Sequence, residues 1–122
     1  MNSPKLVAKF LQDSIGREKR EYFVILFLDS RNNLIKKNIS IGSLNTSIVH
    51  PREVFKEAIR VSAAQIVIGH NHPSGDPEPS PEDVALTRRL EDAAKIFGID
   101  LLDHIVVTTN TFSSFRERRL LL

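Results

Sequence analysis

The apolar residues near the start of the chain recur at helical spacing. Those between positions 6 and 11 follow Ser3 and Pro4, a serine cap and a first-turn proline that favour the beginning of a helix. Residues 16–20 are glycine and charged side chains. The pattern therefore predicts a short N-terminal helix and then a charged connector.

A wholly apolar run follows the connector. Residues 22–28 read YFVILFL, and a run so rich in β-branched and aromatic side chains is typical of a strand buried on both faces. After a polar turn, residues 34–41 alternate well enough to be its hairpin partner. Residues 42–47 are polar, and Ile48 and Val49 could return as a short strand.

Helical and strand-like spacing then alternate. Pro51 opens a second helix, residues 65–69 form an apolar strand, residues 81–97 form a long helix that Gly98 ends, and residues 99–108 form another buried strand. The helical stripes expected to be buried are Val54, Phe55, Ala58, Ile59, Val84, Leu86, Leu90, Ala93, Ala94 and Phe97.

The order of these elements is helix, hairpin, helix, strand, helix, strand. Such an order predicts an α/β (α+β) domain, with a mixed sheet flanked by helices. Its length of 122 residues suits one domain. The segment 112–122 has no clear pattern.

Composition narrows the chemistry. The chain has no cysteine, so a metal site must use histidines and carboxylates. No stretch has the length of a membrane span and the N-terminus has no signal-peptide layout, so we expect no membrane partner and a cytoplasmic location. The net charge is +2 with scattered basic residues, which favours a solvated surface over a nucleic-acid-binding face.

Two histidines mark the end of a predicted strand. His70 and His72 are two residues apart and would point to the same side. Asp83 follows in the first turn of the next helix, and three such ligands with a vacant fourth position are typical of catalytic zinc. The alternative is structural, because Ser80 and Asp83 also form the pattern of a capping box.

Other zinc motifs are absent. The chain lacks H-x-E with P-C-x-x-C, which excludes a zinc nucleobase deaminase, and H-E-x-x-H, which excludes a zincin protease. Its HNHP and SPED segments instead match the motif H-x-H-P-x6-S-x2-D of the JAB/MPN (JAMM) metalloenzymes. The runs HNHPSGDPEPSPEDVALTRRL, GIDLLDHIVV and SLNTSIVHPREVFKEAI resemble the bacterial RadC family in particular, and this resemblance covers residues 21–115.

The resemblance implies a curved mixed sheet of cytidine-deaminase-like architecture over residues 21–122, preceded by residues 1–20 as a helix and connector. It also implies one zinc ion per chain, held by His70, His72 and Asp83. A glutamate upstream would be the general acid/base. Its position in the family indicates Glu21, and Glu53 is the alternative.

The function implied is zinc-dependent hydrolysis of a peptide or isopeptide bond, with Ser80 helping to hold the developing oxyanion and an unidentified peptide or protein as substrate. The alternative is a non-enzymatic module of DNA repair or recombination with a structural zinc. A metal-dependent nuclease ranks lower, because one three-ligand site is not a two-metal layout. Longer family members carry a helix-hairpin-helix domain that would contact DNA, so we expect this chain to bind DNA weakly or not at all.

Four polar residues near these motifs have structural interpretations. His50 is expected at the surface before a helix. Asp103 and His104 are expected to form a buried structural pair, with a supporting role near zinc as the alternative. Asn71 is expected to fix its loop through backbone hydrogen bonds.

Overall fold

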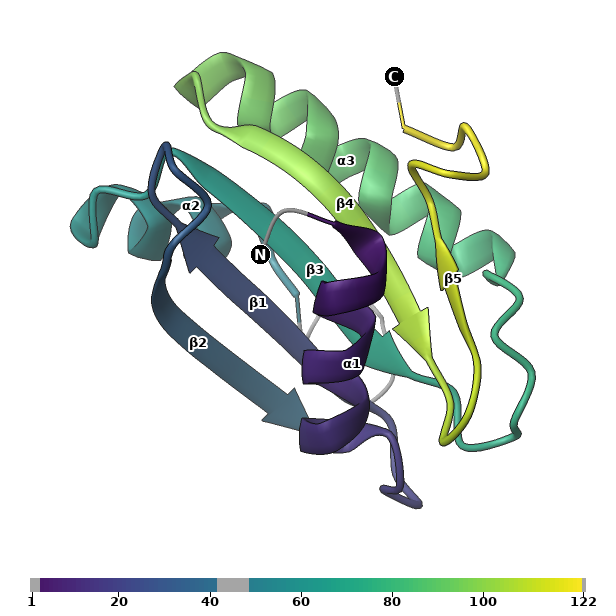
Figure 1. Ribbon diagram of the computed structural model, residues 1–122. Helices are drawn as coiled ribbons and strands as arrows, with labels where there is room; N and C mark the ends of the chain where they lie inside the picture. The colour runs from purple at the N-terminus through teal and green to yellow at the C-terminus, as the bar shows by residue number, and fades with distance from the viewer. Residues whose placement is uncertain (1–2, 42–48, 122) are drawn as a thin grey trace.

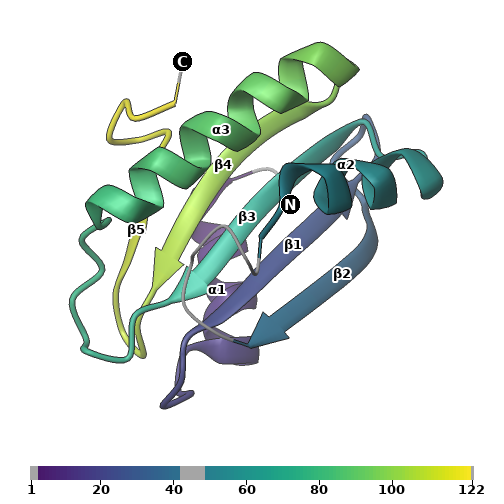
Figure 2. The ribbon, with the colours of Figure 1, turned by 180° about the vertical axis from the view of Figure 1, so that it is seen from behind.

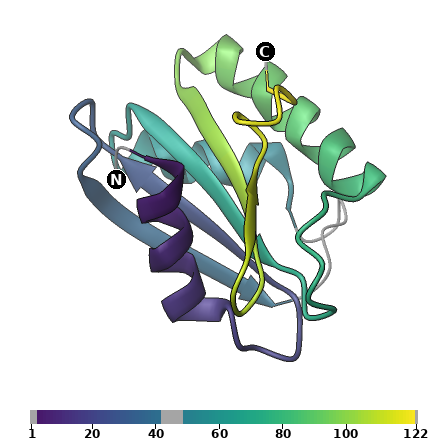
Figure 3. The same ribbon diagram turned by 45° about the vertical axis from the view of Figure 1, so that its right-hand side comes forward.

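Three helices and a five-stranded sheet make up the residues that the computed structural model describes, 3–41 and 49–121 (Figure 1). Helix α1 (Pro4–Ile15) lies on one face of the sheet. Helices α2 (Pro51–Arg60) and α3 (Pro81–Phe97) cover the other face, which Figure 2 shows from behind. The sheet is the middle of three layers (Figure 3), and the predicted α/β class is confirmed.

The sheet is mixed and has the order β2-β1-β3-β4-β5. Strand β1 pairs antiparallel with β2 and β3, β3 pairs parallel with β4, and β4 pairs antiparallel with β5. The strands are β1 (Tyr22–Leu28), β2 (Leu34–Ile41), β3 (Gln65–Asn71), β4 (Asp100–Val107) and β5 (Phe112–Ser114). The predicted hairpin and apolar strands are confirmed. β5 was not predicted, because three residues held by backbone pairing are too short to show a period.

The apolar run of β1 follows from the burial of this strand on both faces of the sheet. Successive side chains of a strand point to opposite faces, and β1 divides accordingly between two apolar clusters. Phe23, Ile25 and Phe27 pack in the cluster that includes α2 and α3, whereas Val24, Leu26 and Leu28 pack in the cluster that includes α1. A polar residue in this strand would therefore have no solvated face to occupy.

Helix α1 approaches β3 closely at Gly69. A Cβ atom at Gly69 would lie 2.5 Å from Cδ1 of Leu11, which is fully buried, so one of the two would have to shift. The missing side chain at Gly69 thus lets α1 pack tightly against the strand, one residue before His70.

Side-chain caps fix where each helix begins. All three begin at a proline after a capping residue, and the cap accepts a hydrogen bond from a first-turn backbone N–H in each case. The pairs are Ser3 with Leu6, His50 with Arg52, and Ser80 with Asp83. Gly98 ends α3 in the left-handed conformation with φ of 68°, as its position predicted.

Some predicted core positions are wrong. Ile59 is 56% exposed, because α2 packs through Val54, Phe55 and Ala58 and the next residue lies about 100° further round the helix. Phe97 is half-exposed, since it ends α3 with only one ring face stacked on Phe55. Val49 lies outside the strands, and Ile48 falls outside the described residues.

Candidate metal centre

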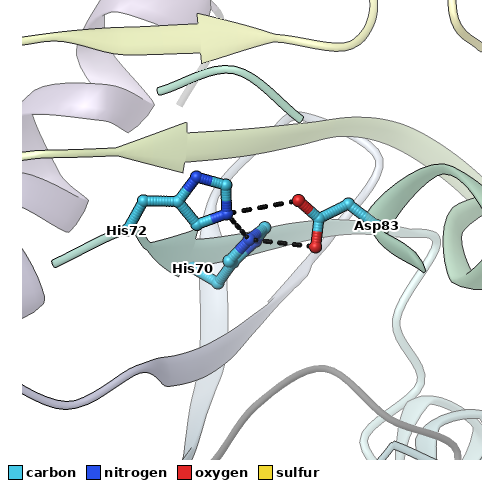
Figure 4. Close-up of side chains that lie close together, drawn as sticks. All are labelled: His70, His72 and Asp83. Carbon is cyan, nitrogen blue, oxygen red and sulfur yellow. Dashed lines mark hydrogen bonds and ion pairs between the residues drawn. The ribbon is translucent and has the colours of Figure 1, made fainter. Parts of the chain in front are cut away.

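Two neighbouring elements bring His70, His72 and Asp83 together. His70 lies near the end of β3, and His72 follows directly, with its backbone N–H donating to the carbonyl of Val107 at the end of β4. Asp83 lies in the first turn of α3. The loop after β3 leads back to the sheet at the N-terminus of this helix. Figure 4 shows the three side chains pointing toward one another, His70 from β3, His72 from the segment just after it and Asp83 from α3.

The ligand atoms of these residues converge on one point. Nε2 of His70 lies 2.8 Å from Nε2 of His72. The carboxylate of Asp83 faces both rings, with Oδ1 3.3 Å from His70 and Oδ2 3.2 Å from His72. The ligand atoms of the three side chains all lie within 4.8 Å of one another, close enough to hold one metal ion. The structure thus brings together the three residues whose spacing predicted a common site, in a group that could hold a metal ion.

The hydrogen bond of His72 Nδ1 shows which ring nitrogen carries the proton in the neutral ring. Nδ1 lies 3.0 Å from the carbonyl oxygen of Asp76, which can only accept a hydrogen bond, so Nδ1 carries a proton and donates. In the neutral ring Nε2 then has a lone pair directed at Asp83. A lone pair facing a carboxylate needs a cation between them. That cation is either a second ring proton, which forms a hydrogen bond to Asp83, or a metal ion with nitrogen and oxygen ligands in its place.

The electrostatics of the site agree with cation binding. The Asp83 carboxylate, chiefly through its hydrogen bond, raises the pKa of His72, and burial opposes this shift. Burial by itself raises the pKa of Asp83, but the hydrogen bonds of His70 and His72 outweigh it and hold this pKa well below its usual range. Asp83 is therefore ionised and compensated by whatever positive charge the two rings share or bind.

Asp83 is a helix cap as well as a candidate ligand. Its Oδ2 accepts a hydrogen bond from the Ser80 backbone N–H at 2.8 Å, and Ser80 Oγ accepts from the Asp83 N–H at 3.1 Å. This reciprocal pair is a capping box. The two interpretations of Asp83 are compatible, because the cap holds the carboxylate where the imidazoles meet it.

Asn71 ties the N-terminal connector to β3, the strand that carries His70. Its Oδ1 accepts a hydrogen bond from the Tyr22 N–H at 2.6 Å, and its Nδ2 donates to the carbonyl of Arg20 at 2.8 Å. The residue between those two partners is Glu21, which is half-buried and whose charge contributes to raising the pKa of His72. Asn71 thus fixes the backbone on both sides of Glu21 beside the ligands.

Glu53 and His50 lie on α2. Glu53 is exposed and faces Arg52 at 3.8 Å. Glu53 and His50 line a cavity of about 120 Å³ together with Phe23 and Val54. His50 is the exposed N-cap of α2, in agreement with its predicted place at the surface. Glu21 and Glu53 therefore stand in different surroundings, and the residues on both sides of Glu21 are hydrogen-bonded to Asn71 in the strand that carries His70.

Asp103 and His104 are joined as predicted only through the backbone, because the His104 N–H donates to Oδ1 of Asp103 over 2.7 Å while the two side chains go separate ways. Consecutive strand residues point to opposite faces, and the Asp103 carboxylate accepts hydrogen bonds from the Ser114 hydroxyl and the Arg116 N–H. Burial raises the pKa of Asp103, against these bonds. His104 instead faces the metal centre, with Nε2 2.7 Å from Nδ1 of His70. Its other neighbour is Thr87, which sequence reasoning missed although it lies four residues after Asp83 on one helix face.

Comparison with known proteins gives one family. The family model described as a RadC-like JAB domain matches residues 1–120. A UPF0758 protein of Shouchella clausii is 51% identical over 119 residues, covering 97% of this chain and 52% of the relative. UPF0758 proteins of Bacillus cereus and Pelobacter propionicus are 50% and 49% identical over similar spans. The chain spans about half the length of these relatives. The resemblance noted in the sequence is confirmed.

Proposed function

Because this chain belongs to the RadC-like JAB domain family and gathers two imidazoles and a carboxylate at one point, we propose that it is a zinc-dependent hydrolase of the metallopeptidase type. The observation that carries the proposal is the convergence of His70, His72 and Asp83 on one centre. Three protein ligands of nitrogen and oxygen type leave the fourth zinc position for water or substrate.

The donor set is one that zinc accepts. Imidazole and carboxylate ligands match this borderline cation, and thiolates are not required. A bound zinc ion would polarise the scissile carbonyl and lower the pKa of water toward about 7. The side chain of His72 is 13% exposed whereas that of His70 is 1% exposed, so substrate would reach the centre from the side of His72.

Glu21 would move the proton. Its carboxylate is close enough to influence His72, and Asn71 holds the backbone on either side of it. In the proposed reaction Glu21 takes a proton from the attacking water and gives it to the leaving amine, which is general acid–base catalysis. Glu53, exposed on α2, is the alternative residue for this role.

Ser80 would stabilise the oxyanion. Its hydroxyl oxygen accepts the hydrogen bond from the Asp83 N–H. A hydroxyl that accepts one bond still has its own proton to donate. Placed next to a metal ligand at the helix N-terminus, that proton can be donated to the oxygen that becomes negative as the carbonyl is attacked.

Metal analysis and a substrate screen test this function. Protein purified without added metal should contain zinc close to one ion per chain, and His70→Ala and Asp83→Ala should remove it. Zinc retained in both variants would overturn the site. The loaded protein should then hydrolyse peptide or isopeptide substrates. Full zinc occupancy with no such hydrolysis would favour the non-enzymatic DNA repair module with a structural zinc.

A further inference from the structure

A chain of buried hydrogen bonds connects two of the candidate ligands behind the metal centre. It runs from Nδ1 of His70 to Nε2 of His104 over 2.7 Å, and from Nδ1 of His104 to Oγ1 of Thr87 over 2.6 Å. It ends where Thr87 Oγ1 donates to the carbonyl oxygen of Asp83 over 2.7 Å. All four residues are buried, so water does not compete for these bonds.

The last acceptor, the Asp83 carbonyl oxygen, decides which atom donates in each of these hydrogen bonds. The backbone carbonyl of Asp83 can only accept, so the hydroxyl proton of Thr87 is committed to it. A hydroxyl has one proton, and the Thr87 oxygen therefore meets His104 as an acceptor. Nδ1 of His104 must then carry a proton and donate it to Thr87.

The direction carries through to His70. The ring of His104 is fully buried and contacts an imidazole and a hydroxyl rather than a carboxylate, surroundings in which a neutral ring is strongly favoured over a charged one. With its proton on Nδ1, neutral His104 accepts at Nε2, so His70 must donate from Nδ1. Nε2 of neutral His70 is left with a lone pair aimed at Asp83 and His72.

We propose that Thr87 and His104 are positioning residues that hold His70 in the tautomer with a metal-binding lone pair on Nε2. Metal-ligating histidines generally donate their other N–H to a carboxylate, a carbonyl or water. Here the acceptor is a second imidazole, whose own orientation is fixed by Thr87 and by the ring of Phe115 stacked on it at 4.3 Å. The inference rests on the metal centre proposed above.

Without the Thr87 hydroxyl, His104 and His70 should no longer be held in one tautomer each. In Thr87→Val, a side chain of similar shape, Nδ1 of His104 loses its acceptor. The proton of His104 can then move to Nε2 and be donated to His70, which places the His70 proton on Nε2, where it opposes a metal ion. Zinc affinity should fall by about 10- to 100-fold, the usual cost of losing an outer partner of a ligand.

Nuclear magnetic resonance reads the tautomers directly. The chain has four histidines, so long-range ¹H–¹⁵N spectra of the zinc-loaded protein are simple to assign. His104 should show a protonated Nδ1 and an unprotonated Nε2, and His70 a protonated Nδ1. His104 protonated at Nε2 would overturn the proposal. The His104 tautomer can also be read in the metal-free protein, so the proposal stays testable if zinc does not bind.

Zinc affinities of variants provide the second measurement, by competition with a chromophoric chelator. Thr87→Ser keeps the hydroxyl and should bind zinc as the unaltered protein does. Thr108→Val, at another buried and hydrogen-bonded threonine, is the matched control and should also be unchanged. Equal affinity in Thr87→Val and the unaltered protein would overturn the proposal, whereas zinc binding by neither would overturn the metal centre instead. If Thr87→Val does not fold, the tautomer of the unaltered protein decides.

Discussion

Asp83 shows how much one side chain can do at a helix N-terminus. Its carboxylate accepts the hydrogen bond from the Ser80 N–H and faces both imidazoles. The cap orients the carboxylate before any metal binds, which limits the conformational entropy lost on binding. At the scale of single residues, the site therefore uses secondary-structure chemistry to organise its ligands.

The general base can be identified by two matched substitutions. Glu21→Gln removes the proton acceptor but no zinc ligand, so zinc content should be unchanged while turnover falls by about 10²- to 10⁴-fold. Glu53→Gln should leave both values near those of the unaltered protein. Zinc analysis and turnover on the substrate found in the screen check this. The reverse pattern would assign the role to Glu53.

Ser80 is expected to affect stability and rate separately. Ser80→Ala should lower the free energy of unfolding by about 1 kcal/mol through the lost cap. It should also slow turnover by on the order of a hundredfold, as loss of one oxyanion donor does. Zinc content should not change, because Ser80 is not a ligand.

Ser80→Asp is the control for these two effects. An aspartate caps a helix well but, when ionised, cannot donate a hydrogen bond. It should restore the melting temperature and not the rate. Full turnover in Ser80→Ala would mean that Ser80 is only a cap.

At the scale of elements, the end of β3 is where the site is assembled. Side chains that alternate along this strand serve different purposes: His70 points to the centre, while Asn71 holds the connector before β1. Glu21 comes from a segment far away in sequence, and β3 is antiparallel to β1. The end of β3 therefore lies beside the start of β1, and a polar side chain there can bind both.

Asn71→Ala should loosen the connector without removing a ligand. It leaves the partly buried Tyr22 N–H without its partner, which should cost about 1–3 kcal/mol of stability. Turnover should fall by up to about 10²-fold through misplacement of Glu21, with zinc still bound. Hydrogen exchange at residues 18–22 should become faster. The exposed Asn110→Ala is the matched control, and equal exchange and turnover in both variants would contradict this role of Asn71.

At the scale of the whole molecule, the formal charge is small and part of it is paired. The net charge is +2, and several basic side chains are paired with acidic ones, as Lys36 and Arg60 are with Glu57. Within residues 3–41 and 49–121, no helix could cross a membrane. A small net charge with basic side chains held in ion pairs supports the expectation that this chain binds nucleic acid weakly.

DNA binding by this chain should accordingly be weak. We expect dissociation constants of about 10⁻⁴–10⁻⁶ M at physiological salt, the range of non-specific phosphate contacts. The affinity should fall steeply as the salt concentration rises. Fluorescence anisotropy with duplexes of unrelated sequence, at low and physiological salt, measures this. Tight and sequence-selective binding would overturn the ranking of hydrolase over DNA-repair module.

The sequence alone determined the features that depend on local spacing. The strand YFVILFL, the proline-initiated helices and the two histidines followed by Asp83 each depend on residues close together in the chain. Burial on two faces requires an unbroken apolar run, and a cap requires a fixed short offset. The fold class and the candidate ligands could therefore be predicted.

Only the tertiary structure decided what surrounds the ligands. His104 meets His70 across 34 residues, and Asn71 meets Arg20 across 51. Such contacts depend on the pairing order of the strands and on the face to which each side chain points once its neighbours are in register. The same reason explains why Asp103 and His104, adjacent in sequence, do not share a site: their strand separates them to opposite sides of the sheet, and only His104 faces the metal centre.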